Sequence, residues 1–247
     1  METATPVPAR RNLAPVKPSP EQRLRRMHDA LAAAYGRQHW WPADSPFEVI
    51  LGAYLTQNTS WKAVERSLAN LKAANAFTLD ALRNIPVEDL QTLIRPSGFH
   101  TRKAPALKAF VAMLDAEFAG SLTQIAAAPT QQLRRRLLAL PGVGPETADA
   151  ILLYALGHPV PVADEYLRRI ADRHRLLTVE PGRKGYQSLA TLTLRAFADD
   201  LSANHPSLFN EFHALTVAVG KAHCGKAPHC SGCPLAGDLE HSSNPGR

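Results

Sequence analysis

The residues with the clearest chemical potential lie in one stretch, where a glycine-containing turn is followed by a carboxylate. The turn has the sequence LPGVG at residues 140–144, and Asp164 comes twenty residues after its last glycine. Because glycine lacks a Cβ, such a turn can adopt backbone angles that other residues avoid. Pro145 suits the first position of a following helix, whose unpaired N-terminal amides favour an anionic oxygen. We therefore expect a main-chain phosphate grip formed by Gly142, Val143 and Gly144.

Asp164 stands between an extended, proline-containing loop and a predicted helix over 166–176. This placement is typical of a helix N-cap, whose carboxylate stays ionised because the helix N-terminus stabilises the charge. A fixed carboxylate can stabilise a developing cation, and it can orient or deprotonate a water molecule. Asp164 is therefore the candidate catalytic residue, with an ordinary solvated cap as the alternative.

The composition is compatible with a polyanionic partner. Lys and Arg number 28 against 22 Asp and Glu, a net charge of +6, which alone is only a weak indication of nucleic-acid binding. No apolar run approaches the roughly 18 residues needed to cross a bilayer. Residues 1–20 contain five prolines and no apolar run, which predicts a disordered basic tail rather than a secretory signal. We expect a soluble, cytoplasmic protein with no membrane partner.

Helical periodicity dominates the remaining sequence, and no segment shows the two-residue alternation of a strand. Pro, Gly or capping residues separate the periodic segments. The fold is therefore predicted to be all-α. The expected helices cover residues 20–35, 47–55, 64–73, 78–84, 87–94, 103–117, 121–127, 129–140, 166–176, 185–199 and 206–223.

The hairpin turn, the loop residues Gly157 and Pro159, and Asp164 together resemble the helix-hairpin-helix, Gly/Pro…Asp superfamily of DNA glycosylases, to which endonuclease III belongs. The resemblance covers nearly the whole chain after the first twenty residues. It implies that Asp164 faces the deoxyribose of an extruded nucleotide, where base cleavage develops oxocarbenium-like charge. It also implies a two-lobed fold, with a six-helix barrel over 45–156 that ends in the helix-hairpin-helix and a second helical lobe made of 21–44 and 157–247.

Glu146 decides which chemistry the resemblance implies. In bifunctional members such as endonuclease III, a lysine two residues after the second hairpin glycine forms a Schiff base. Glu146 occupies that position here, and a carboxylate cannot form an imine. The departure implies a monofunctional glycosylase without AP-lyase activity. Lys221 matches a basic residue close to the base pocket in relatives; it either tunes Asp164, contacts phosphate, or is a solvated lysine at a helix end.

All three tryptophans fall between residues 40 and 61. The segments HWWP at 39–42 and TQNTSW at 56–61 resemble the 3-methyladenine DNA glycosylase branch of the superfamily. A purine alkylated on N3 or N7 is cationic, so electron-rich aromatic rings attract it more than the neutral base. We expect Trp40 and Trp61 to sandwich the base and Trp41 to pack in the core. The alternative is that all three are core or interface residues.

Two loops are candidates for filling the space that an extruded base leaves in the duplex. Gln57 and Asn58 follow an apolar helix, and an amide side chain occupies this loop in relatives. Residues 96–104 resemble the family's Gly-aromatic-x-x-x-Lys-Ala turn. There Phe99 or His100 would wedge into the opposite strand while Arg102 and Lys103 hold phosphate, unless these are ordinary loop residues. Residues 134–136, three arginines in a row, are either a general phosphate-facing surface or a solvated one.

Cys224, Cys230 and Cys233 resemble the iron–sulfur loop of the superfamily, which has four cysteines. Leu239 stands where the fourth cysteine is expected. Three interpretations stay open: a [4Fe-4S] cluster with His241 as fourth ligand, a zinc ion bound by three Cys and one His, or a loop without metal. The loop is expected to dock DNA. The resemblance also implies a structural monovalent cation at the hairpin.

Three functions follow, in order of preference. The first is a monofunctional base-excision-repair glycosylase that hydrolyses the N-glycosidic bond of alkylated purines such as 3-methyladenine. The second is an endonuclease III-like glycosylase and AP lyase for oxidised pyrimidines or mismatched thymine. The third is a non-catalytic sensor of DNA damage. In each case the expected partner is double-stranded DNA containing a damaged base, bound by a monomer.

Overall fold

The computed structural model describes residues 17–41, 43–200 and 206–242, with side chains up to residue 239. These residues form helices and loops without a β-strand, so the all-α prediction is confirmed. The predicted tail, residues 1–20, lies almost entirely outside them. The elements are α1 (Pro20–Tyr35), α2 (Pro46–Leu55), α3 (Trp61–Ala73), α4 (Leu79–Asn84), α5 (Val87–Leu93), η1 (Arg95–Ser97), α6 (His100–Phe118), α7 (Leu122–Ala126), α8 (Thr130–Leu138), α9 (Pro145–Ala150), η2 (Ile151–Ala155), α10 (Glu165–Arg173), α11 (Gly182–Ala196), α12 (Pro206–Ala222) and α13 (Ala236–Ser242).

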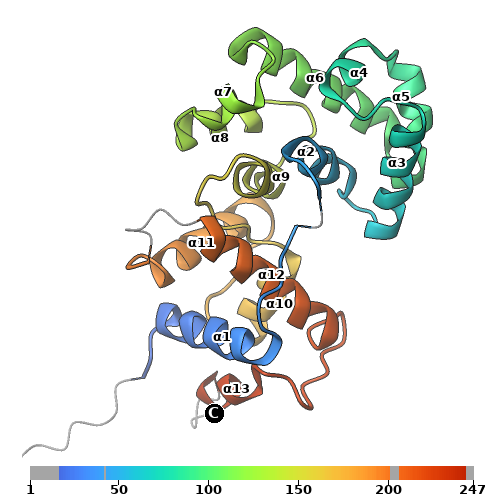
Figure 1. The fold of residues 1–247 in the computed structure, drawn as a ribbon. Helices are drawn as coiled ribbons and strands as arrows, with labels where there is room; N and C mark the ends of the chain where they lie inside the picture. Colours follow the sequence, from blue (N-terminus) through green and yellow to red (C-terminus); the bar gives the residue numbers. More distant parts are fainter. Residues whose placement is uncertain (1–16, 42, 201–205, 243–247) are drawn as a thin grey trace, which may run out of the picture.

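The helices gather in two groups (Figure 1). Helices α3 to α8 lie at one end of the molecule, α1 and α10 to α13 lie at the other, and α9 lies between them. Helix α1 packs against α11 and α12, which come from the opposite end of the sequence. The predicted lobe bounds, 45–156 against 21–44 plus 157–247, stay a prediction. None of the described helices is long and apolar enough to span a membrane.

Helix α2 connects the two groups. Its residues from Phe47 to Leu55 are all buried, as expected for a helix that is apolar on every side. It contacts α3 and α6 from one group and α9 and η2 from the middle of the chain. The loop after α2, which carries Gln57 and Asn58, is thereby held against the hairpin between α8 and α9.

The hairpin turn has the local structure that its glycines predict. Gly142 has a φ of 74°, in the left-handed region that a Cβ would strain. Gly144 is the N-cap of α9, and Pro145 is its first residue. Helix α9 then widens into the π-helical turn η2, a distortion that is frequent at functional sites. The chain continues through an extended loop to α10, whose N-cap is Asp164.

Candidate active site

A cavity of about 670 Å³ opens between the hairpin, the loop after α2 and the start of α10. It brings together most of the residues that the sequence singled out, although they are far apart along the chain. Those that line it are Trp40, Gln57, Asn58, Trp61, Gly142, Gly144, Glu146, Asp164 and Lys221. Trp41, Thr147, Tyr166 and His213, which sequence reasoning did not assign to the site, also line it.

Asp164 caps α10 as expected. Its Oδ1 accepts a hydrogen bond of 2.8 Å from the backbone N–H of Leu167. Its Oδ2 lies 3.5 Å from Nε2 of His213. The residue is 8% exposed and lines the cavity. The helix therefore fixes Oδ1, whereas Oδ2 is not bound by the helix. The capping role is confirmed, and the catalytic role stays a prediction.

His213 has partners on both ring nitrogens. Besides its contact with Asp164, its Nδ1 lies 2.6 Å from the hydroxyl of Tyr154 in η2. Both side chains are largely buried, and burial together with the negative charge of Asp164 raises the pKa of Tyr154 well above its ordinary value. No local pattern marks a single histidine on an apolar helix such as α12, which is why sequence reasoning missed it.

The aromatic wall differs from the expected sandwich because Trp41 is part of it. The ring of Trp41 lies 5.9 Å from that of Trp40 and 5.6 Å from that of Trp61, edge-to-face in both cases. It also lies 5.4 Å from the ring of Tyr154. Gly52 leaves the space for this, since a Cβ there would lie 3.2 Å from Cζ2 of Trp41. The prediction that Trp41 packs in the core is therefore wrong.

Two of the indole groups still have unused donors. The N–H groups of Trp40 and Trp41 are buried without a hydrogen-bond partner, which is costly unless a ligand or water completes them. Lys221, exposed at the cavity edge, places Nζ 5.5 Å from the centre of the Trp40 ring. The wall therefore offers aromatic faces and one cation to the cavity, whereas the two indole N–H groups are enclosed by protein atoms.

Glu146, the second residue of α9, lines the cavity from the hairpin side. Water reaches it through the cavity mouth, but surrounding protein atoms bury enough of the carboxyl group to raise the pKa of Glu146 to about 7. The charge of Asp164 adds to this increase, and His213 opposes it. Near neutral pH the group is present in both protonation states, so it can donate or accept a hydrogen bond.

Gln57 and Asn58 have different surroundings. The Gln57 amide donates hydrogen bonds to the carbonyl of Gly142, at 3.0 Å, and to the hydroxyl of Thr147, at 2.9 Å. It therefore ties the loop after α2 to the hairpin. Asn58 is exposed, with a left-handed φ of 52°. Of the two amides, Asn58 is the one placed to meet a ligand outside the protein.

The second predicted loop splits into exposed and buried residues. Phe99 is 55% exposed, a rare state for a large apolar side chain in this protein, and Arg102 is exposed beside it, whereas His100 is half-buried. Lys103 is buried, and its Nζ donates to the carbonyls of Leu55 and Ser97, at 2.8 and 2.9 Å. Burial also lowers the pKa of Lys103 to about 8. The prediction that Lys103 holds phosphate is therefore wrong, because its ammonium group joins α2 to the end of η1.

The arginine run also differs from expectation. Arg134 forms a two-point ion pair with buried Asp149, at 2.6 and 2.9 Å. Arg136 pairs with Glu117, and Arg135 is exposed. Two of the three arginines thus bind carboxylates of the protein rather than forming a free phosphate-facing surface.

The cysteine loop is held by arginines. Cys224 is buried, Cys230 exposed and Cys233 intermediate. The guanidinium group of Arg173 donates to Sγ of Cys224, at 3.0 Å, and to the carbonyls of the next two residues. Nearby, Arg23 donates to Asp238 of α13, so the end of the described chain is fastened to α1.

The residues around these cysteines do not fit a four-iron cluster. Leu239, in place of the fourth cysteine, lines the same void as Cys224, Cys230 and Cys233, and its free volume is about 30 Å³, room for roughly one or two water molecules. Among the described side chains no group of three His, Cys, Asp or Glu is placed to hold a metal ion. The side chain of His241 lies outside them.

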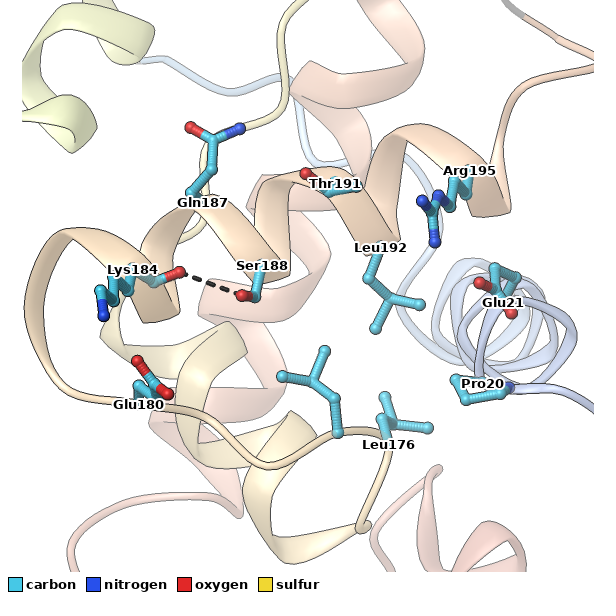
Figure 2. A pocket seen from close by; sticks show the side chains of 11 residues that line it. Pro20, Glu21, Leu176, Glu180, Lys184, Gln187, Ser188, Thr191, Leu192 and Arg195 are labelled. Carbon is cyan, nitrogen blue, oxygen red and sulfur yellow. Dashed lines mark hydrogen bonds between the residues drawn. The ribbon is translucent and has the colours of Figure 1, made fainter.

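A second cavity, of about 640 Å³, lies between the start of α1, the segment 176–180 and α11. Figure 2 shows the aliphatic side chains of Leu176 and Leu192 in the middle of this cavity, with Lys184 on one side and Glu21 and Arg195 on the other. None of the described residues that line it is aromatic, and none of them also lines the cavity at Asp164. The candidate active site is therefore the cavity at Asp164.

Comparison with known proteins agrees with this geometry. Residues 51–192 match the family model for HhH-GPD superfamily base excision DNA repair proteins. A Methanocaldococcus jannaschii protein, provisionally named a DNA repair glycosylase, is 37% identical over 212 residues, 85% of this chain and 92% of that protein. A thymine/uracil-DNA glycosylase of Pyrobaculum aerophilum is 29% identical over 204 residues, 81% of this chain and 82% of that protein. The structure of H. pylori 3-methyladenine DNA glycosylase bound to 1,N6-ethenoadenine is similar with a TM-score of 0.69 at 28% identity, covering 83% of this chain and 98% of that one. The chain therefore belongs to the HhH-GPD superfamily of base excision DNA repair proteins and is a DNA glycosylase of that superfamily.

Proposed function

We propose that the enzyme is a monofunctional glycosylase that hydrolyses the N-glycosidic bond of alkylated purines such as 3-methyladenine in double-stranded DNA. The observation that supports this most is the juxtaposition of Asp164 with three tryptophans around one cavity. An aromatic wall attracts a cationic purine, and a fixed carboxylate stabilises the cation that develops on the sugar. Both demands of the reaction are thereby met within one site.

In this proposal Asp164 acts on the sugar. As the C1′–N bond breaks, positive charge spreads over C1′ and the ring oxygen, as in other glycosidic cleavage. The Asp164 oxygen that is not engaged by α10 faces this charge and orients the attacking water, or removes its proton. The alkylated purine leaves readily because it departs as a neutral base, so strong acid catalysis is unnecessary.

The base would be held by the wall and by Glu146. Stacking on the tryptophan rings orients the base. Ionised Glu146 attracts a cationic base, and protonated Glu146 donates to an acceptor on it. Lys221 lies at the cavity edge, where it suits a phosphate.

Glu146 is also the reason why we expect no lyase activity. Glu146 cannot form the Schiff base that strand cleavage requires. Among the described residues that line the cavity, Lys221 is the sole lysine, and its ammonium group lies over the Trp40 ring. We therefore expect base release by water, with an intact abasic strand as product.

Duplex DNA would be gripped by the hairpin and distorted by the exposed loop residues. The N–H of Val143 already donates to the carbonyl of Leu140, so the amides from Gly144 onward, at the start of α9, are those that suit a phosphate. Asn58 suits the gap left by the extruded base, and Phe99 with Arg102 suits the opposite strand. The enzyme would act as a monomer. We further propose that the cysteine loop works without a metal ion, because Leu239 replaces one ligand and Arg173 already engages Cys224.

One observation favours a second candidate. The Pyrobaculum aerophilum relative, a thymine/uracil-DNA glycosylase, shares 29% identity over 204 residues, so uracil or mismatched thymine is the competing substrate class. A neutral pyrimidine gains less from an aromatic wall than a cationic purine does, which is why we rank it second.

The proposal is tested by incubating the enzyme with duplexes that contain 3-methyladenine, thymine glycol or a T·G mismatch. Each reaction is analysed with and without subsequent alkali. Cleavage of the 3-methyladenine duplex that depends on alkali is the expected result. Strand nicking without alkali would contradict monofunctional action, and release from only the pyrimidine duplexes would favour the second candidate. Binding without release in every duplex would leave a damage sensor.

A further inference from the structure

The orientation of the Asp164 carboxylate depends on two contacts, and only one of them belongs to α10. The helix holds Oδ1 through the N–H of Leu167. Nε2 of His213 lies 3.5 Å from the other oxygen, Oδ2. A carboxylate fixed at one oxygen can still rotate about the Cβ–Cγ bond unless the other oxygen is also restrained.

We propose that His213, itself oriented by Tyr154, is a positioning residue that aims Asp164 at the sugar. This inference rests on the proposed function, since it gives His213 a role in base release. His213 and Thr216 are both buried, and the Thr216 hydroxyl donates to the His213 carbonyl within α12. The imidazole is buried and lies 2.6 Å from the Tyr154 hydroxyl through Nδ1, so it has little freedom to leave Asp164.

The donors and acceptors form one consistent chain. An ionised Asp164 only accepts hydrogen bonds, so the nitrogen that faces it, Nε2 of His213, must carry a proton if the two interact. In a neutral imidazole the other nitrogen, Nδ1, then accepts from the Tyr154 hydroxyl at 2.6 Å. The Tyr154 hydroxyl also lies 3.4 Å from the carbonyl of Asn210, and when it donates to the closer Nδ1 of His213 it selects the tautomer that points an N–H at Asp164. The distance of 3.5 Å is long, as catalytic hydrogen bonds often are before substrate binds.

Helix α12 and Tyr154 connect this pair with the rest of the site. His213, Val217 and Lys221 all line the cavity, because residues four apart share one helix face. Glu211, also on α12, accepts a 2.7 Å hydrogen bond from the N–H of Gln38, just before the tryptophan segment. The ring of Tyr154 packs on Trp41. The carboxylate and the aromatic wall are therefore positioned by the same elements.

The test compares His213→Phe and His213→Gln under single-turnover conditions on the 3-methyladenine duplex. Phenylalanine keeps the bulk and removes the donor, so the rate of base release should fall about ten- to a hundred-fold, the range that a hydrogen bond to a charged group supplies. Glutamine retains an amide N–H near the position of Nε2 and should recover part of the rate. The Kd for the duplex should stay within about three-fold for both variants.

A matched pair of tyrosines guards against misfolding of the His213 variants. Tyr154→Phe removes the hydroxyl that orients His213 and should slow base release several-fold. Tyr54→Phe removes a buried hydroxyl that has no hydrogen-bond partner and should leave the rate unchanged. Circular dichroism checks the fold of each variant. If His213→Phe does not fold, the rates of the two tyrosine variants test the positioning role of His213 instead.

Some results would overturn the inference. They are an unchanged rate in His213→Phe, a loss that appears wholly in Kd, a glutamine variant no better than phenylalanine, or equal rates in the two tyrosine variants. A wild-type enzyme that releases none of the tested bases would overturn the proposed function, and the inference with it. Wild-type activity with an unaffected His213→Phe would overturn the inference alone.

Discussion

Replacing Arg134 with methionine would remove one partner of a buried ion pair and leave the other inside the protein. Asp149, on α9 of the hairpin, is 2% exposed. It accepts two hydrogen bonds from Arg134 and one, at 2.9 Å, from the hydroxyl of Tyr186. The same hydroxyl lies 3.5 Å from the N–H of Ala163, the residue before Asp164. The network therefore joins the hairpin to the loop that carries the candidate catalytic carboxylate.

The cost follows from the burial of the remaining charge. Removing one partner of a buried pair typically lowers the free energy of unfolding by about 3–5 kcal/mol. The side chains of Asp149 and Arg134 are 3% and 20% exposed, and the partial exposure of Arg134 puts the expectation near the lower end, at about 3 kcal/mol. Arg136 pairs with Glu117 through side chains that are 49% and 31% exposed, which is worth about 0.2–1 kcal/mol.

Urea unfolding, followed by circular dichroism, measures both variants. Arg134→Met should lower the midpoint of the transition clearly, whereas Arg136→Met, the control from the same helix, should lower it little. An unchanged m-value would show that the variants differ in stability rather than in the surface exposed on unfolding. If both variants unfold at the same urea concentration, the reasoning from burial is refuted.

Further predictions concern single positions. Because the pKa of Glu146 is raised to about 7 from 4.5, this carboxyl group destabilises the fold progressively as pH rises from about 4.5 to 7. Glu146→Gln should therefore raise the free energy of unfolding at pH 8, by less than about 1 kcal/mol for a group open to water, and not at pH 4; an equal increase at both pH values contradicts this. Lys103→Met leaves two carbonyls unpaired and should cost about 2–3 kcal/mol in urea unfolding, while Arg102→Met should instead reduce the salt dependence of DNA binding; the reverse pattern would restore Lys103 as a phosphate ligand. Gly52→Val should push Trp41 into the cavity and slow base release about ten-fold or more, and an unaffected rate would show that Trp41 does not shape the pocket. Purified protein should contain substoichiometric iron and zinc and no absorption near 400 nm, and stoichiometric metal would disprove a metal-free cysteine loop.

Features encoded by neighbouring residues could be predicted from the sequence. The hairpin at 140–144 follows from its two glycines and Pro145, and the capping role of Asp164 follows from its place before a helix. The helices follow from periodicity and capping residues, except α13, whose seven residues are too few to show a helical period. The resemblance to the glycosylase superfamily then predicted that the hairpin, the tryptophan segments and Asp164 belong to one site.

Features that depend on long-range contacts could not be predicted. Lys103 is directed inward because carbonyls of Leu55 and Ser97 are left for it to satisfy. Trp41 reaches the cavity because Gly52 makes room on a different helix. His213 and Tyr154 are 59 positions apart, and nothing near either residue marks the pair. In each case the side chain's role is set by packing between distant elements.

Single-turnover base release by Asp164→Asn, compared with the wild type on the 3-methyladenine duplex, tests the proposed chemistry most directly. Asparagine caps a helix about as well as aspartate, so the fold and DNA affinity should survive while the anion is lost. We expect the rate of base release to fall by roughly a thousand-fold or more, with Kd nearly unchanged. A variant that releases 3-methyladenine at close to the wild-type rate would show that the reaction does not depend on this carboxylate.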